Sequence, residues 1–364
     1  MLMFPPREMH AFPDSTRRSC RLAGLALLPV LLAASARLCA RTGEGQGVYE
    51  FSLPRMGTTL RLKFYAANEA EAQKAANAVF DRVEDLEQIF SDYRDDSELT
   101  QLSRVGGSAP RVVSPEMFEV LESSLRISEL SGGAFDVTVG PVVELWRQAR
   151  RTQVMPDAAA LARAKAAVGY RNLELDAQHR TVFLKRRDMK LDVGAIAKGY
   201  AADQALALLG SRGISRALVG AGGDLRIGAP PPGRPGWAVV VDSPDTASGR
   251  RPCTLLLHDV GISTSGNSRQ FADIHGRRFS HIIDPATGMG LEGAASSTVI
   301  ARNGTTADGL ATALSVLPPQ AGLRAAESVE GASAYLVRQS PRGWEYYSSR
   351  GFPGACNEPG KRGR

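Results

Sequence analysis

Residues 191–201 have the sequence Leu191-Asp192-Val193-Gly194-Ala195-Ile196-Ala197-Lys198-Gly199-Tyr200-Ala201. An apolar run in this stretch ends in an acidic residue, and a helix start that contains glycines and a lysine follows directly. Backbone N–H groups and the positive dipole end at such a start favour anions, and a nearby carboxylate can hold a metal or a ligand hydroxyl. The stretch therefore indicates a phosphate-binding or metal-binding turn between a strand at 190–193 and a helix that ends near 210–213. An ordinary turn with a solvated Lys198 explains the same pattern.

Hydrophobic periodicity predicts a mixed α and β chain around this turn. Asn68 and Glu71 form a capping-box signature that opens a strongly amphipathic helix ending near Phe90. Further helices are expected at 114–132, 156–168 and 305–317, and a short one after 318–319. The predicted strands are short and bounded by turns, which favours antiparallel sheets: 48–53, 58–66, 173–175, 181–184, 217–219, 225–228, 237–242, 255–257, 262–264, 282–284, 297–301, 334–337 and 344–347.

The N-terminus has the composition of an export leader. Arg17, Arg18 and Arg21 precede an apolar run at 22–36 that is short for a bilayer span, and small residues at 34–36 and 38–40 fit signal cleavage. We therefore expect a leader over residues 1–40 and a periplasmic protein, with a membrane anchor as the alternative. One large domain is expected over 41–350, followed by a flexible tail over 351–364.

Composition limits the other classes of function. The 364-residue chain is 43% apolar and 23% charged with a formal net charge of +6, which is ordinary for a soluble globular protein. Basic residues are scattered without interleaved aromatic residues, so nucleic-acid binding is not expected. No zinc-ligand spacing occurs. Outside the leader region only Cys253 and Cys356 remain, and a disulfide between them is permitted in an exported protein but is not required by the sequence.

Asp308 and Thr312 stand four residues apart on a predicted helix. This spacing puts a carboxylate and a hydroxyl on one helical face. Oxygen ligands of this kind suit Mg²⁺, which fills its remaining positions with water and substrate phosphates. The alternative is that Asp308 caps or solvates the helix while Thr312 packs.

Seven islands of sequence, taken together, resemble the ApbE family of FAD:protein FMN transferases over about 48–347. They are Met56-Gly57-Thr58, Ser91-Asp92-Tyr93-Arg94, Gly133-Ala134-Phe135-Asp136-Val137, Val168-Gly169-Tyr170-Arg171-Asn172, Gly222-Gly223-Asp224, Ser280-His281-Ile282-Ile283-Asp284-Pro285-Ala286-Thr287-Gly288 and Thr306-Ala307-Asp308-Gly309-Leu310-Ala311-Thr312-Ala313-Leu314. The resemblance implies an α+β, T-fold-like domain of two intertwined halves, with mixed or antiparallel sheets and packed helices.

The resemblance also implies the residues of the site. In the family, the residues that match Asp308 and Thr312 bind magnesium together with the backbone carbonyl at Ala195. The positions that match FAD contacts are Met56, Tyr93, Ala134, Phe135, Asp136, Asp192, Lys198 and Ile282. A thioether and aromatic rings suit a flat heteroaromatic ligand, and a carboxylate can accept from its N–H or O–H groups.

Two positions depart from the family pattern. Asp224 stands where asparagine is common, and Gly266-Asn267-Ser268 varies from the usual run. These departures concern acceptor contacts more than FAD chemistry. The Gly222-Gly223-Asp224 island is interpreted as a strand turn near the site.

The activity implied is magnesium-dependent transfer of FMN from FAD to a threonine hydroxyl of an acceptor protein, with release of AMP. His281 is the first candidate for the base that takes the hydroxyl proton, because an imidazole titrates near neutral pH, and Asp192 is the second. The implied acceptor is an exported or membrane-bound subunit of the Rnf or Nqr type. Two alternatives stay open: an FAD pyrophosphohydrolase that gives FMN and AMP, and an FAD carrier that is not an enzyme.

Overall fold

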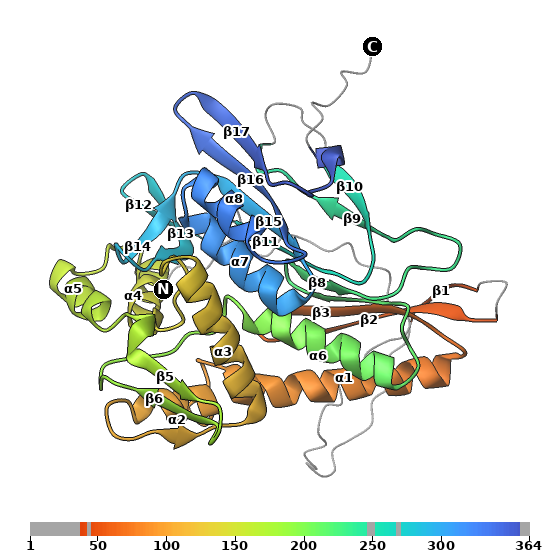
Figure 1. Cartoon of the computed structure of the whole chain (residues 1–364), viewed down its shortest axis with the longest axis horizontal. Helices are drawn as coiled ribbons and strands as arrows, with labels where there is room; N and C mark the ends of the chain where they lie inside the picture. The colour runs from red at the N-terminus through yellow and green to blue at the C-terminus, as the bar shows by residue number, and fades with distance from the viewer. Residues whose placement is uncertain (1–36, 42–44, 246–251, 267–270, 357–364) are drawn as a thin grey trace, which may run out of the picture. The chain divides into compact units, whose positions relative to one another are not determined.

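The computed structural model describes residues 37–41, 45–245, 252–266 and 271–356 (Figure 1). Within these residues, nine strands pair antiparallel into one sheet in the order β1-β2-β3-β7-β8-β11-β15-β16-β17. Their bounds are β1 Arg37–Arg41, β2 Gly47–Arg55, β3 Thr58–Ala66, β7 Ala217–Ala221, β8 Asp224–Ile227, β11 Gly261–Gly266, β15 Ala295–Ala301, β16 Ser333–Ser340 and β17 Gly343–Ser348.

The described residues also form three smaller antiparallel sheets. The first pairs β9 (Trp237–Val241) with β10 (Cys253–Leu257), and the second joins β12 (Phe271–Ile274), β13 (Arg277–Asp284) and β14 (Met289–Glu292). The third joins β4 (Arg111–Val112), β6 (Thr181–Leu184) and β5 (Leu173–Asp176). The helices are α1 Glu69–Phe90, α2 Glu98–Arg104, α3 Pro115–Leu130, α4 Gly140–Thr152, α5 Ala158–Ala166, α6 Ala197–Ser211, α7 Gly304–Val316 and α8 Pro319–Glu327, with short 3₁₀ turns at Tyr170–Asn172 and Gly354–Cys356.

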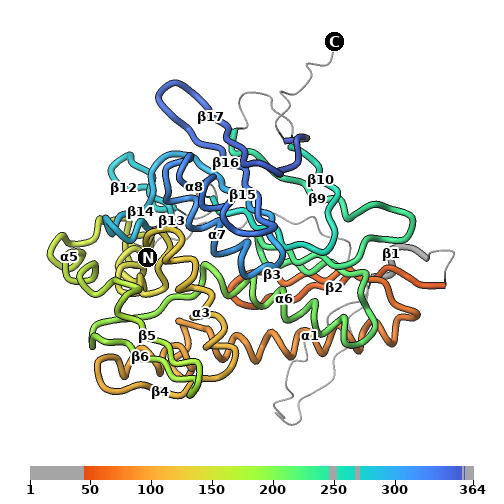
Figure 2. The backbone as a smooth tube through the Cα atoms, viewed as in Figure 1, coloured from red at the N-terminus to blue at the C-terminus, as the bar shows by residue number. Residues whose placement is uncertain are grey.

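Helix α6 lies where two parts of the core meet. Its residues Ala202, Ala205 and Leu209 pack with α1 against β2, β3 and β7, whereas Ala197 and Tyr200 belong to a cluster built from α3, α7 and β15. Figures 1 and 2 show α1 and α6 running side by side, and α7 contacts both α6 and β11. Helix α6 therefore contributes to both hydrophobic clusters, with its first turn in the cluster that contains α7.

The antiparallel α+β fold and most predicted elements are confirmed. The Asn68 side chain accepts a hydrogen bond of 2.9 Å from the Glu71 N–H at the start of α1, as its capping signature predicted. The predicted strand at 190–193 is wrong, because the chain there joins no ladder beyond one parallel bridge from Lys190 to Val139. The Leu191 N–H bonds the Ser103 hydroxyl instead, at 3.1 Å. Leu191 and Val193 are both buried, which explains the strand-like apolar pattern.

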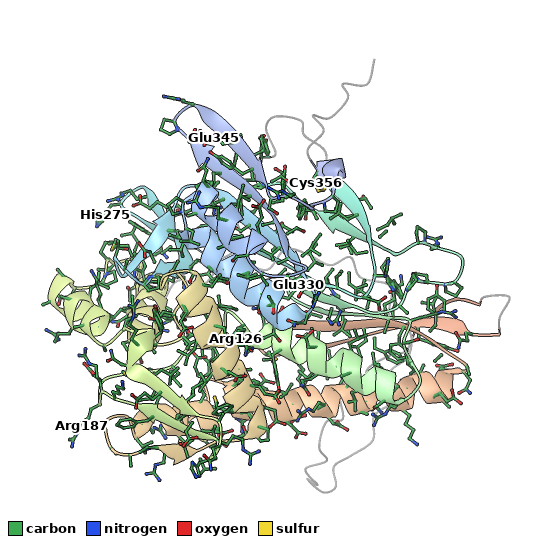
Figure 3. The ribbon with its side chains drawn as sticks, in the orientation of Figure 1. Arg126, Arg187, His275, Glu330, Glu345 and Cys356 are labelled. Atoms are coloured by element: carbon green, nitrogen blue, oxygen red, sulfur yellow. A yellow bond between two sulfur atoms is a disulfide. The ribbon has the colours of Figure 1, made fainter. Side chains whose placement is uncertain are left out.

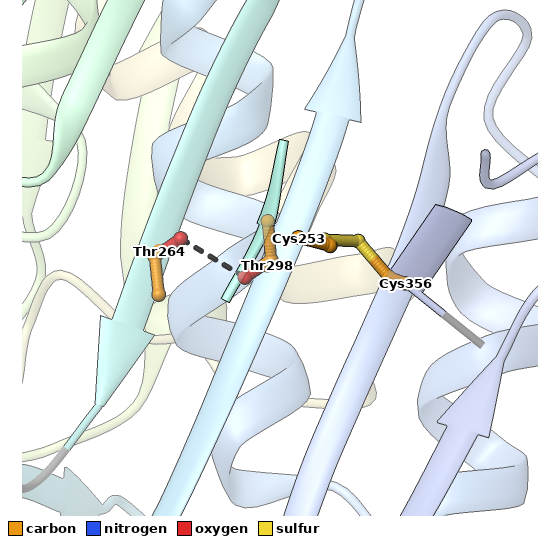
Figure 4. The surroundings of a disulfide bond; sticks show 4 residues. All are labelled: Cys253, Thr264, Thr298 and Cys356. Carbon is orange, nitrogen blue, oxygen red and sulfur yellow. Dashed lines mark hydrogen bonds between the residues drawn. A yellow bond between two sulfur atoms is a disulfide. The ribbon is translucent and has the colours of Figure 1, made fainter. Parts of the chain in front are cut away.

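The C-terminal segment is fixed to the domain through Cys356. Phe352, within the segment expected to be a flexible tail, is buried and stacks on Tyr335 with ring centroids 5.5 Å apart. Cys356 forms a disulfide with Cys253 of β10 (Figure 4). Phe352 and Cys356 thus hold this segment against the domain, while residues 357–364 lie outside the described residues.

Most of the predicted leader, residues 1–36, also lies outside the described residues, as do Asn267 and Ser268. Residues 37–40, the rest of that predicted leader, belong to β1, which pairs with β2. Among the helices of the described ranges, none has the length and apolar character needed to cross a bilayer.

Candidate functional site

Two glycines bring α6 and α7 into close contact. A Cβ atom on Gly199 would lie 2.2 Å from the Gly304 carbonyl oxygen and 2.8 Å from the Asp308 Cβ, so only glycine fits. The N-terminus of α7 is fixed to α6 by Asp203, whose carboxylate accepts from the Gly304 N–H at 2.7 Å and from the Thr305 N–H at 2.8 Å. This contact brings Lys198 and Asp308 together although they lie 110 residues apart.

Lys198 bridges two buried carboxylates. Its Nζ lies 3.1 Å from Asp224 Oδ2 and 3.2 Å from Asp308 Oδ2, and it donates to the Gly194 carbonyl at 2.9 Å. Asp308 also accepts from the Gly199 N–H at 3.0 Å, and Asp224 accepts from the Ser263 hydroxyl. The predicted turn before α6 therefore converges with β8, β11 and α7 on one charged centre.

Burial controls the electrostatics of this centre. Asp308 is 2% exposed and Asp224 4% exposed. Burial, followed by repulsion from Asp224, raises the pKa of Asp308 to about 7, although Lys198 and the Gly199 N–H oppose this rise. Burial by itself would lower the pKa of Lys198, but the attraction of Asp224 and Asp308 outweighs it and raises that pKa. Lys198 is thus a permanent cation beside two carboxylates whose charges it offsets.

The donor set at this centre fits a hard divalent cation. Thr312 lies one turn after Asp308 on α7, and its Oγ1 is 3.2 Å from the Ser265 hydroxyl on β11. The carbonyl of Ala195 follows that of Gly194, to which Lys198 donates. Among the described residues no group of three or more His, Cys, Asp or Glu side chains could hold a metal. A few protein oxygens with open positions are what Mg²⁺ takes in phosphate-handling sites.

Asp192 belongs to a second charged cluster. This cluster includes Arg147, which was not among the predicted site residues. Arg147 of α4 bonds Asp192 Oδ2 at 3.0 Å and also pairs with Asp92. Its guanidinium carbon lies 4.5 Å from the centroid of the Tyr93 ring, which is 78% exposed. The other Asp192 oxygen accepts from the Gly194 N–H at 2.8 Å, so Asp192 connects this cluster to the turn before α6.

The remaining predicted FAD contacts come from three separate segments. Met56 occupies the turn between β2 and β3 with φ of 50°, and its N–H donates to Glu87 Oε1 at 3.1 Å. Ile282 is buried on β13, its N–H bonding the Ser280 hydroxyl at 3.0 Å, whereas His281 is exposed. Helix α7 contacts β13, which brings the His281 strand to the helix of Asp308.

The segment with Ala134, Phe135 and Asp136 is engaged inside the protein. Phe135 is buried in the core, and Ala134 follows two glycines of positive φ. Asp136 accepts from the Thr138 N–H and hydroxyl and from the Tyr170 N–H, at 2.8, 2.6 and 2.8 Å. Burial raises the pKa of Asp136, and these hydrogen bonds oppose the rise. Its carboxylate therefore ties the turn before α4 to the turn before β5.

The structure brings Lys198, Asp308, Thr312 and the Ala195 turn together, with Asp192 adjoining through Gly194. Sequence reasoning did not include Asp224, Ser263, Ser265 or Arg147 among the site residues. The Gly222-Gly223-Asp224 island was the available signal for Asp224, and its interpretation as a turn near the site is confirmed by the hairpin between β7 and β8. No local pattern marked Arg147.

The chain is similar to known flavin transferases along most of its length. The model of the ApbE family matches residues 56–336. The FAD:protein FMN transferase of Klebsiella pneumoniae (strain 342) is 33% identical over 303 residues, which cover 82% of this chain and 86% of the relative. The FAD:protein FMN transferase of Haemophilus influenzae is 31% identical over 336 residues, covering 90% and 96%. The solved flavin transferase ApbE of Vibrio cholerae superposes with a TM-score of 0.75 at 30% identity, covering 84% of this chain and 98% of that one.

Proposed function

Because this chain belongs to the ApbE family, we propose that it is an FAD:protein FMN transferase. It transfers FMN from FAD to a threonine hydroxyl of an acceptor protein. The threonine oxygen attacks the FMN-side phosphorus of FAD, the bond from that phosphorus to the bridging oxygen breaks, and AMP leaves with that oxygen. The observation that carries the proposal is the convergence of Lys198, Asp224 and Asp308, with Thr312 one helical turn after Asp308 on α7.

Asp308, Thr312 and the Ala195 carbonyl are the proposed magnesium ligands. Mg²⁺ held by these residues would offset the negative charge that develops on the pyrophosphate oxygens in phosphoryl transfer. Lys198 adds a fixed cation at the same place, and the tight packing of α6 on α7 keeps these groups in position. Preorganised charge of this kind is the main protein contribution to phosphoryl transfer.

His281 is the better of the two candidate bases. Asp192 uses one oxygen to pair with Arg147 and the other to accept from the Gly194 N–H. Both oxygens of Asp192 are therefore already used in contacts within the protein. His281 is exposed on the strand that contacts α7, and an imidazole titrates near neutral pH.

The acceptor proposed is an exported or membrane-bound flavoprotein subunit of the Rnf or Nqr type, and the enzyme is proposed to act in the periplasm. The basic and apolar N-terminal sequence supports export. The Cys253–Cys356 disulfide also supports it, because disulfides persist in oxidising compartments.

The test is incubation of the purified protein with FAD, Mg²⁺ and a threonine-containing acceptor, followed by mass spectrometry of the acceptor. An FMN-sized mass gain that EDTA abolishes supports the transferase. Free FMN and AMP with an unmodified acceptor would instead indicate the pyrophosphohydrolase. Tight binding of FAD that stays intact would indicate a carrier.

A further inference from the structure

Arg147 contacts two residues that family resemblance places at the FAD site, Tyr93 and Asp192. It lies in the middle of α4, and its side chain is about 21% exposed. One guanidinium contacts three groups from two distant segments: Asp92 and Tyr93 from the α1–α2 connection, and Asp192 from the turn before α6. The planar fork of arginine can pair with two carboxylates and stack on a ring at the same time, whereas lysine cannot.

The neighbouring residue, Trp146, fixes α4 to a second segment. The Trp146 indole N–H donates to the Gly288 carbonyl at 2.8 Å, and its ring packs against Phe279 with centroids 5.1 Å apart. Gly288 follows the turn that starts at Asp284, at the end of the strand that carries His281 and Ile282. Adjacent residues of α4 therefore hold two segments in which family resemblance places flavin contacts.

Without Arg147, two carboxylates would face each other. Asp92 and Asp192 have side chains 15% and 12% exposed, and both pair with the same guanidinium. Burial, followed by repulsion from Asp192, raises the pKa of Asp92 in spite of that pairing. Without the guanidinium, repulsion would separate the two carboxylates. The Tyr93 ring, which is 78% exposed, would also lose its contact with Arg147.

We propose that Arg147 is a positioning residue for FAD binding: it neutralises Asp92 and Asp192 together and holds the Tyr93 ring in the orientation that receives the flavin nucleotide. The inference rests on the proposed function, because the family resemblance behind that function is also what places Tyr93 and Asp192 at the FAD site. It goes further by assigning a role to a residue that does not itself need to touch the ligand.

The test is a set of FAD dissociation constants, measured by calorimetry without an acceptor so that no transfer is needed. The variants are Arg147→Gln, Asp92→Asn, the double variant and Arg147→Lys. Arg126→Gln is the control, since Arg126 of α3, labelled in Figure 3, forms an exposed ion pair with Glu122 of the same helix. Thermal unfolding of each variant checks that it is folded. Steady-state assays with an acceptor then separate KM for FAD from kcat.

We expect Arg147→Gln to weaken FAD binding about tenfold with kcat changed less than about twofold, and the control to bind as the wild type does. Removing the Asp92 charge as well should recover about threefold of the loss, because the repulsion is then gone. Simple loss of packing would not be rescued in this way. Arg147→Lys keeps a positive charge but lacks the planar guanidinium, so its affinity for FAD should lie between those of the wild type and Arg147→Gln. If Arg147→Gln does not fold, the affinity of Arg147→Lys is the test.

Wild-type affinity in both Arg147 variants would overturn the inference, as would an equal loss in Arg147→Gln and the double variant. A wild-type protein that does not bind FAD would overturn the proposed function and this inference together. A wild type that binds FAD but modifies no acceptor would count against the transferase only, because the affinities of the variants still decide the role of Arg147.

Discussion

Lys198 Nζ lies 3.2 Å from Asp308 Oδ2, and this ion pair joins the first turn of α6 to the middle of α7. The same ammonium reaches Asp224 on β8 at 3.1 Å. Both carboxylates are buried, so the lysine supplies the charge that makes their proximity tolerable in the absence of another cation. Two carboxylates and one ammonium leave the centre with a net negative charge, which a bound cation would offset.

Lys198→Met should destabilise the protein by about 3 kcal/mol in EDTA, because it leaves two neighbouring buried carboxylates without a counter-charge. Added Mg²⁺ should recover part of this loss, since a bound cation replaces the missing charge. Urea unfolding with and without Mg²⁺ measures both effects. Lys190→Met is the control, because Lys190 forms a surface pair with Glu144 that should contribute less than about 1 kcal/mol. Equal stability of the two variants would contradict this account of the centre.

Gly199→Ala and Gly210→Ala form a matched pair on α6. A Cβ at Gly199 would clash with the Gly304 backbone, whereas a Cβ at Gly210 meets nothing within 4 Å. We expect Gly199→Ala to cost about 2 kcal/mol and to reduce activity strongly by separating Lys198 from Asp308. Gly210→Ala should be neutral or stabilising by about 0.5 kcal/mol, because alanine favours the helix. Thermal unfolding and FMN transfer by both variants test the packing; a tolerated Gly199→Ala would refute it.

The order of helices and strands along the chain was predictable from local signals in the sequence. The tertiary contacts between these elements were not. The capping residue Asn68, the apolar stripe of α1 and the turn-bounded strands are local features, and they predicted the α+β class. The placement of Asp308 and Thr312 one turn apart on a helix was predictable from the sequence, and α7 contains both. Asp224 reaches Lys198 only through the pairing of β7 with β8, which no local pattern specifies.

The errors of sequence interpretation have equally physical causes. The segment 190–193 alternates apolar residues because Leu191 and Val193 are buried by their surroundings, not because the segment pairs in a sheet. Helix α4 begins without a side-chain cap at Val139, so it lacked the start signal that revealed α1 and α3. The sequence therefore did not reveal the helix that carries Arg147. It also did not reveal the partners of Arg147, because Asp92 and Asp192 lie 55 and 45 residues away along the chain.

Asp92→Asn should show a pH-dependent effect on stability. The pKa of Asp92 is raised above its ordinary value of 3.8, chiefly by burial, so the folded state binds more protons than the unfolded state just above that pH. Stability from this group is present at low pH and declines as pH rises through the raised pKa. The variant lacks this decline, so its stability relative to wild type should improve from pH 4 to pH 7. Urea unfolding at both pH values measures it, and a relative stability that worsens with pH would show that the sign is wrong.

Reduction of the Cys253–Cys356 disulfide should destabilise the domain by about 4 kcal/mol, because the bond closes a long loop between residues 103 positions apart. Urea unfolding of the oxidised and reduced protein measures the difference. In the Cys253→Ser, Cys356→Ser double variant the reductant should have no effect. An unchanged unfolding midpoint on reduction of the wild type would contradict a stabilising role for the bond.

The central claim is that Asp308 and Thr312 hold the catalytic metal. Its most direct test is to measure the rate of FMN transfer as a function of Mg²⁺ concentration for the wild type and for Thr312→Val. Thr306→Val, on the same helix, is the control. The claim that Asp308 and Thr312 hold the catalytic metal predicts that Thr312→Val needs at least about tenfold more Mg²⁺ for half its maximal rate, because one oxygen ligand is lost. Thr306→Val should match the wild type. An Mg²⁺ dependence that Thr312→Val leaves unchanged, or transfer that proceeds at full rate in EDTA, would contradict the claim.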